Sequence, residues 1–170
     1  VGNYLWIYAN GLEDSPVHQG DPPDKSISRS AVIDHDVSNM HEVKQRLHEH
    51  ADTVAQELRA KNSSARTIGI WVCDNNMGYV QRQRTIPIPT NLGTDIGEVV
   101  VSLFEDTYKW HSPVRKLAVV CNNLILADTP MQCSFWVDPK RMQKREALAS
   151  AVDGVNQRYP HCVSRAITQY

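Results

Sequence analysis

The sequence is poor in three features that would each point to a class of protein: paired cysteines, long apolar runs and net charge. Its four cysteines are Cys73, Cys121, Cys133 and Cys162. They are scattered, so the close pairs of a zinc site are missing. Such isolated thiols are typical of a reducing compartment, and we expect a cytoplasmic protein. No apolar run approaches the roughly 20 residues of a membrane-spanning helix.

The near-neutral charge excludes a wholly basic protein that binds nucleic acid with its entire surface. Lysine and arginine number 18 against 19 aspartates and glutamates, which gives a formal net charge of −1. Any surface for a polyanion must therefore be a local patch. Hydrophobic residues make up 41% of the 170 residues. This share suffices for the core of one domain with appendages.

Two segments, 25–30 and 79–88, concentrate basic and hydroxyl residues in what we predict to be strands. Side chains two residues apart in a strand point the same way, so Arg82 and Arg84 project from one face. Paired guanidiniums near serine hydroxyls are suited to binding phosphate oxygens. The alternative is a solvated edge strand whose positive charge prevents aggregation.

Hydrophobic periodicity predicts six central elements in the order β-α-β-β-α-β. Apolar residues recur every three or four positions over 40–58 and 96–104, which predicts two helices with one apolar stripe each. Strands are predicted at about 25–33, 66–73, 79–86 and 113–120. Pro87 and Pro89 are expected to end the third strand, because proline lacks the N–H that a ladder needs. A short helix is predicted before Gly11, and a charged helix over 138–159 with Asp138 as its cap.

This order predicts an α+β fold with a four-stranded antiparallel sheet. The two striped helices would cover one face of the sheet and leave the other face open. Arg82 and Arg84 could lie on the open face. Val80 and Ile86 share their side of the strand, so the sequence does not decide between the two faces.

Three motifs in this order resemble the little finger domain of Y-family translesion DNA polymerases: Lys25-Ser-Ile-Ser-Arg29, Arg82-Gln-Arg-Thr85 and Val114-Arg-Lys-Leu-Ala-Val119. The flanking segments 5–11 and 151–159 are similar to the thumb end and the tail of the bacterial UmuC/ImpB/MucB/SamB-like branch. The resemblance implies a thumb end and tether over 1–22, a little finger over 23–127, and a tail with a helix over 128–170. We expect a piece of a larger protein.

By this resemblance the chain is a non-catalytic fragment that grips the backbone of primer–template DNA. Its role would be damage bypass and DNA repair as part of the SOS response. Little fingers contact phosphates with strand backbone, hydroxyls and basic side chains, which positions a protein on DNA without reading its sequence. Carried over position by position, the DNA-binding residues would be Lys25, Ser26, Ser28, Arg29, Arg82, Arg84, Thr85 and Arg115.

The segment Gln132-Cys-Ser-Phe-Trp136 resembles the Gln-Leu-Ser-Leu-Phe peptide by which bacterial polymerases dock on the sliding clamp. Gln132 and Ser134 match, Phe135 and Trp136 keep the bulky apolar end, and Cys133 departs from the usual leucine. Adjacent aromatics on a linker are suited to anchoring in an apolar pocket. The alternative is that both rings pack back onto the domain.

Catalysis in this family depends on palm-domain carboxylates that hold two metal ions. The sequence has no such carboxylate motif and no glycine-rich phosphate loop. We therefore expect neither a catalytic residue nor a cofactor in this chain. The parent protein would be a DNA-directed DNA polymerase that needs Mg²⁺ in its palm domain.

Two other classes of function fit the predicted fold. An RNA-binding domain would stack bases on aromatics of two central strands, and Trp71 is the residue that supports this alternative. A small enzyme or a protein-interaction domain with a ferredoxin-like sheet is the other. An enzyme would need a His, Cys or carboxylate pair placed to assist a nucleophile, and the sequence shows no convincing pair.

Overall fold

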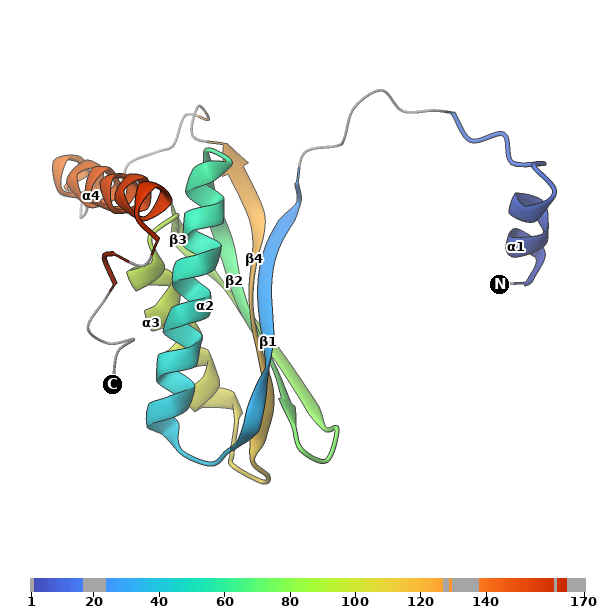
Figure 1. Ribbon diagram of the computed structural model, residues 1–170, viewed down its shortest axis with the longest axis horizontal. Coiled ribbons are helices and arrows are strands. Elements are labelled where there is room, and N and C mark those ends of the chain that lie inside the picture. The colour runs from blue at the N-terminus through green and yellow to red at the C-terminus, as the bar shows by residue number, and fades with distance from the viewer. Residues whose placement is uncertain (1, 17–23, 127–128, 130–137, 161, 165–170) are drawn as a thin grey trace.

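The computed structural model describes residues 2–16, 24–126, 129, 138–160 and 162–164. Its central elements follow the predicted order β-α-β-β-α-β (Figure 1). They are β1 (Ser26–Val37), α2 (Met40–Ala60), β2 (Ser63–Asp74), β3 (Tyr79–Thr90), α3 (Gly93–Thr107) and β4 (Val114–Leu126). Two further helices flank this block, α1 (Gly2–Ala9) and α4 (Pro139–Arg158). The α+β fold is therefore confirmed.

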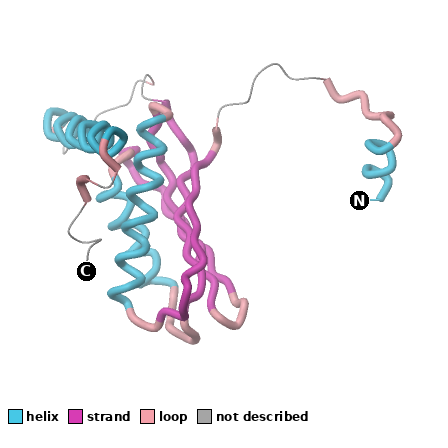
Figure 2. Tube along the Cα trace, in the orientation of Figure 1, coloured by secondary structure: helices cyan, strands magenta, loops and turns pink. Residues whose placement is uncertain are grey.

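The four strands form one sheet in the order β1-β4-β2-β3, and every neighbouring pair is antiparallel. The centre of the sheet is made by β4 and β2, while β1 and β3 are its two edges. Helices α2 and α3 lie on the same side of this sheet, as Figures 1 and 2 show. The two basic segments of the sequence thus belong to opposite edges of one sheet.

The prediction that Pro87 and Pro89 end the third strand is wrong, because β3 continues to Thr90. Two features allow this. β3 is an edge strand, so one of its sides needs no ladder hydrogen bonds. The register with β2 also shifts here, since Thr67 pairs with Thr85 while Ala65 pairs with Thr90. The two prolines lie inside this irregular stretch, where a missing N–H costs little.

The hydrophobic core lies between the helices and one face of the sheet. Asn39 caps α2, because its side chain accepts a hydrogen bond of 2.8 Å from the backbone N–H of Glu42. The apolar stripe of α2 is fully buried: Val43, Leu47, Ala51, Val54 and Leu58. It meets the stripe of α3 and the inward side chains of the central strands. A side chain at Gly97 would collide with the His48 ring, so glycine allows α3 to approach α2 closely.

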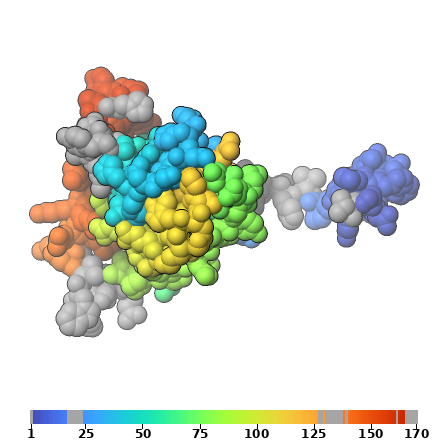
Figure 3. Space-filling view, turned by 90° about the horizontal axis from the view of Figure 1, so that it is seen from below, coloured from blue at the N-terminus to red at the C-terminus, as the bar shows by residue number. Residues whose placement is uncertain are grey.

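Three connections are held together at one end of the domain, seen from below in Figure 3. Asn75, in the turn between β2 and β3, donates a side-chain hydrogen bond of 3.0 Å to Asp36 at the end of β1. Its neighbour Asn76 donates one of 2.9 Å to Ser112, just before β4. The hydroxyl of Tyr108 donates to the carbonyl of Ser112 at 2.6 Å. These bonds fix the turn relative to the ends of the other strands.

Helix α4 is attached to α2 and α3 by charged groups. Arg59 of α2 forms a bidentate pair with Asp153 of α4, at 2.6 Å from Nε and 2.9 Å from an Nη atom. The same guanidinium donates to the carbonyl of Asn91 at 2.6 Å. Arg145 of α4 bonds Asp95 in the first turn of α3. No described residue of α4 is buried, so apolar burial contributes little to this attachment.

Within the described part of the chain, no helix combines the length and the apolar character needed to cross a membrane. Helix α1 also lacks buried residues, and it exposes Tyr4, Leu5, Trp6 and Tyr8.

Candidate nucleic-acid interface

The strand register decides which face of the sheet each candidate side chain occupies. Directly opposite residues of an antiparallel pair point to the same face. Arg84 pairs with Ile68 and Arg82 with Ile70, and both isoleucines are buried beneath the helices. Arg82 and Arg84 therefore belong to the helix-covered face, not to the open one. They stay exposed because β3 is an edge strand.

Arg84 is held at this edge by α3. Its guanidinium lies 3.0 Å from a carboxylate oxygen of Asp106 and 3.3 Å from the hydroxyl of Ser102. Arg82 is exposed and forms no ion pair with a described residue. Of the two arginines, Arg84 is thus held by contacts with α3, whereas Arg82 projects into solvent.

The other edge strand repeats this arrangement. Arg29 of β1 pairs with Val119, so it too belongs to the helix-covered face. Its guanidinium lies 2.8 Å from a carboxylate oxygen of Glu57 on α2. Lys25 is exposed immediately before β1. Arg115 is exposed near the start of β4, where the register of the sheet shifts. Basic side chains therefore border the sheet at both edges.

The open face between these edges carries mainly hydroxyl, amide and small side chains. On β1 its residues are Ser26, Ser28, Ser30 and Val32, and on β4 Asn122, Val120, Ala118 and Lys116. On β2 they are Thr67, Gly69, Trp71 and Cys73, and on β3 Thr85, Gln83, Gln81 and Tyr79. Lys116 is the one charged residue at these positions, all of which the structure describes. None of these paired positions carries a carboxylate, and the exposed Asp34 and Asp36 of β1 lie beyond them, after Val32.

A hydrogen-bonded ladder crosses three strands at one end of this face. The Asn123 side-chain amide donates to the Thr67 hydroxyl at 2.8 Å, and the hydroxyls of Thr67 and Thr85 share a bond of 3.1 Å. Thr67 is buried, whereas Thr85 is exposed. Asn123 has a φ of 52°, a left-handed conformation that asparagine tolerates better than most residues. The ladder holds the hydroxyl of Thr85 in position, and this hydroxyl is one of several exposed ones at this end of the face.

At the opposite end, two aromatic side chains replace the hydroxyls. The rings of Trp71 and Tyr79 are 6.3 Å apart between centroids and inclined by 20°. The Nζ atom of Lys116 lies 5.2 Å from the centroid of the Trp71 ring. Sequence reasoning considered Trp71 alone. The signal that it missed was strand parity, which brings Trp71, Tyr79 and Lys116 to the same corner.

Burial raises the pKa of two titratable groups in the described part of the domain. Burial raises the pKa of the Cys121 thiol to about 12, so this cysteine stays protonated and unreactive. Burial also raises the pKa of Tyr108. Among the residues that the structure describes, no group of three or more His, Cys, Asp or Glu side chains is arranged to hold a metal ion.

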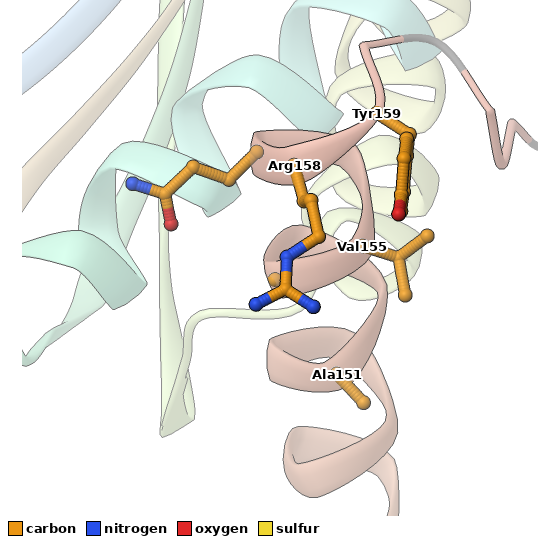
Figure 4. Close-up of a pocket in the computed structure, with 6 residues that line it drawn as sticks. Ala151, Val155, Arg158 and Tyr159 are labelled. Atoms are coloured by element: carbon orange, nitrogen blue, oxygen red, sulfur yellow. The ribbon is translucent and has the colours of Figure 1, made fainter.

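Two hollows lie away from the predicted site. One of about 560 Å³ follows the C-terminal end of α4, where Val155 and Tyr159 lie next to each other (Figure 4). The other, of about 970 Å³, lies between α4, α2 and the start of α3. Neither is lined by a residue predicted to bind DNA. The predicted clamp peptide, Gln132 to Trp136, lies outside the described residues.

Comparison with known proteins identifies relatives over nearly the whole chain. The family model described as the impB/mucB/samB family C-terminal domain matches residues 24–135. A DNA polymerase IV of Acetivibrio thermocellus is 32% identical over 160 residues, covering 93% of this chain and 40% of that protein. The putative UV-damage repair protein UvrX of Bacillus subtilis is 31% identical over 167 residues, covering 94% and 38%. A DNA polymerase IV of Clostridium kluyveri is 28% identical over 166 residues, covering 94% and 41%. The chain thus spans about two fifths of the length of these relatives.

Proposed function

The chain belongs to the impB/mucB/samB family of C-terminal domains, and from this we propose that it is the DNA-binding part of a bacterial Y-family translesion polymerase. In this role it grips the backbone of primer–template DNA during damage bypass and repair in the cytoplasm. Relatives named DNA polymerase IV and UV-damage repair protein support the assignment. Nucleotide addition, with its Mg²⁺ ions, belongs to other regions of the parent polymerase.

The observation that carries the proposal is that both edges of the open face are basic. Lys25 and Arg29 belong to the β1 edge, and Arg82 and Arg84 to the β3 edge. Three inter-strand spacings separate the edges by about 14 Å. The major groove of B-DNA is roughly 12 Å wide. A duplex that presents this groove to the open face would bring one phosphate backbone near each edge.

The open face itself suits close contact with a duplex. Ser26 and Ser28 on β1 and Thr85 on β3 offer exposed hydroxyls near the phosphates. Hydroxyl contacts of this kind hold DNA without reading its sequence. Long arginine side chains at the edges can extend toward the same phosphates, although Arg29 and Arg84 must then leave Glu57 and Asp106.

The test is fluorescence anisotropy of a labelled primer–template across a salt series. The Arg82→Ala plus Arg84→Ala variant is compared with wild type. If each arginine neutralises one phosphate, the double change weakens binding equally on all sequences and lowers the log–log salt slope by about two. The matched control, Arg141→Ala plus Lys144→Ala, removes two exposed cations from α4 and should bind as wild type does. An unchanged slope in the β3 variant would refute the assignment of these arginines.

We also propose that Gln132–Trp136 docks on the bacterial sliding clamp. The support is its sequence, together with its position between the end of β4 and the start of α4. Replacing Phe135 and Trp136 by alanine removes both anchoring rings and should abolish co-elution with the clamp. Wild-type co-elution of this variant would exclude the peptide as the anchor.

The RNA-binding alternative has less support. It requires stacking aromatics on the two central strands, which in this sheet are β4 and β2. The open-face residues of β4 include no aromatic, and Tyr79 lies on an edge strand.

A further inference from the structure

One corner of the open face carries aromatic side chains that binding to the DNA backbone would not require. This aromatic corner consists of Trp71, Tyr79 and Lys116, at the end of the sheet nearest the β2–β3 turn. The rest of the face presents hydroxyls, amides and small side chains, which suit phosphates. The Tyr79 hydroxyl could donate to a phosphate, but the faces of the two rings are not phosphate ligands, so the corner calls for a second chemistry.

The two rings differ in exposure. Trp71 is half-buried and is held by two contacts, the Tyr79 ring at 6.3 Å and the Lys116 ammonium at 5.2 Å. Tyr79 is 71% exposed, and its hydroxyl forms no hydrogen bond with a described residue. One ring is therefore fixed by its neighbours, and the other presents most of its surface to solvent. This is how a preformed stacking platform is built, because the fixed ring loses little freedom when a ligand binds.

We propose that the aromatic corner stacks an unpaired nucleobase of single-stranded DNA next to the duplex. This inference rests on the proposed function and adds a single-strand site to it. Aromatic side chains bind bases of any sequence through their π-faces, and a nearby cation holds the backbone. Lys116 supplies that cation at the corner itself.

Three features favour a nucleobase over an apolar protein segment as the occupant. The open-face positions that pair in the sheet around the corner include no carboxylate; on β1, Asp34 and Asp36 lie beyond this paired register, and Asp36 accepts a hydrogen bond of 3.0 Å from Asn75. The row of Trp71 adds Ser30 and Gln81, whose polar groups suit a base edge or a phosphate. Asp74, at the end of β2, is engaged by the turn, where its carboxylate accepts from the N–H groups of Asn76 and Gly78 at 2.9 and 2.8 Å.

The corner is also continuous with the hydroxyl end of the face. On β2 the open-face residue between Thr67 and Trp71 is Gly69, so no side chain rises between the two ends on this strand. A side chain at Gly69 would lie only 3.1 Å from the Cβ of Gln83. A nucleic-acid strand can therefore follow the sheet from the hydroxyls to the rings.

The test measures the affinity of the full chain for three labelled DNAs: a blunt duplex, the same duplex with a single-stranded overhang, and that overhang with its bases removed. The abasic overhang keeps every phosphate, so it separates stacking from charge. Wild type should bind the base-bearing overhang more tightly than the other two DNAs. Tyr79→Ala should weaken binding to the base-bearing overhang about tenfold and leave the other two affinities unchanged. Tyr79→Phe keeps the ring and should bind as wild type does.

The matched control is Tyr4→Ala, which removes an equally exposed tyrosine (70%) from α1. It should leave all three affinities unchanged. Equal wild-type affinity for the base-bearing and abasic overhangs would overturn the inference, as would an equal loss on all three DNAs in Tyr79→Ala. Loss of self-association without any change in DNA binding would make the corner a protein-docking patch instead. In these cases salt-dependent duplex binding by wild type keeps the proposed function intact, whereas no binding to any DNA would refute both.

Discussion

The two faces of the sheet alternate along the same strands, yet only one of them is covered. On β2, Ile68, Ile70 and Val72 are buried under α2 and α3, while Gly69 and Trp71 between them face the open side. The covered face is uniformly apolar at its centre, and the open face mixes hydroxyls, amides and two rings. The contrast teaches that the covered face accounts for stability and that the open face is available for binding.

The arginines of the two edge strands lie at the boundary between the two faces. Arg29 and Arg84 have the parity of the covered face but escape burial, because each belongs to an edge strand. Each is braced by a carboxylate of the neighbouring helix, Glu57 or Asp106. Helices α2 and α3 thus hold arginine side chains at the two edges of the open face, although neither helix covers that face.

The largest effect is expected for a substitution at the centre of the covered face. Ile70→Ala removes a fully packed side chain from the covered face and should lower the free energy of unfolding by about 2–5 kcal/mol. Ser30→Ala, on the open face of the same sheet, should change it by no more than about 0.5 kcal/mol. Urea denaturation followed by circular dichroism measures both. Similar losses in the two variants would mean that the open face is packed against something.

The sequence predicted the covered face better than the open one. Helical and strand periodicity identified the buried stripes, because burial imposes a regular pattern of apolar residues. It also gave the order of the elements. Periodicity could not give the extent of β3, since an edge strand with an irregular register tolerates Pro87 and Pro89.

The open face could not be assigned from a single strand. Val80 and Ile86 share a side with Arg82 and Arg84, and only the register with β2 shows that this side faces the helices. The aromatic corner is a cross-strand feature as well, because Trp71, Tyr79 and Lys116 come from three different strands. A site assembled across strands leaves no local pattern in the sequence.

A second, smaller effect is expected for helix α4, which lies outside α2 and α3 and is attached to them by charged side chains. The side chains of Arg59 and Asp153 are only 12% and 25% exposed, so their bidentate pair is partly shielded from solvent. Asp153→Ala should weaken the attachment of α4 by about 1 kcal/mol. In hydrogen exchange, the protection of α4 amides should then fall roughly fivefold while that of β2 and β4 is unchanged.

Glu146→Ala is the control for this prediction, because it removes one negative charge from the same helix and Glu146 forms no ion pair with a described residue. It should leave α4 protection near the wild-type value. Equal loss of protection in both variants would show that net charge, rather than the Arg59–Asp153 pair, attaches the helix.

The smallest effect concerns pH and should arise on the covered side, since the open-face positions include no histidine. His50 of α2 has its pKa lowered chiefly by burial; Glu49 opposes this shift and Arg46 adds to it. The unfolded chain, with a pKa near 6.5, therefore binds more protons than the folded one as the pH falls through that value. The stability that neutral His50 contributes is present above pH 6.5 and is lost progressively below it.

Chemical denaturation at pH 7.5 and 5.5 tests this. The loss of stability at the lower pH should be smaller in His50→Gln than in wild type, whereas His111→Gln, at an exposed position, should retain the full loss. An identical acid loss in wild type and His50→Gln would assign the pH dependence to other groups.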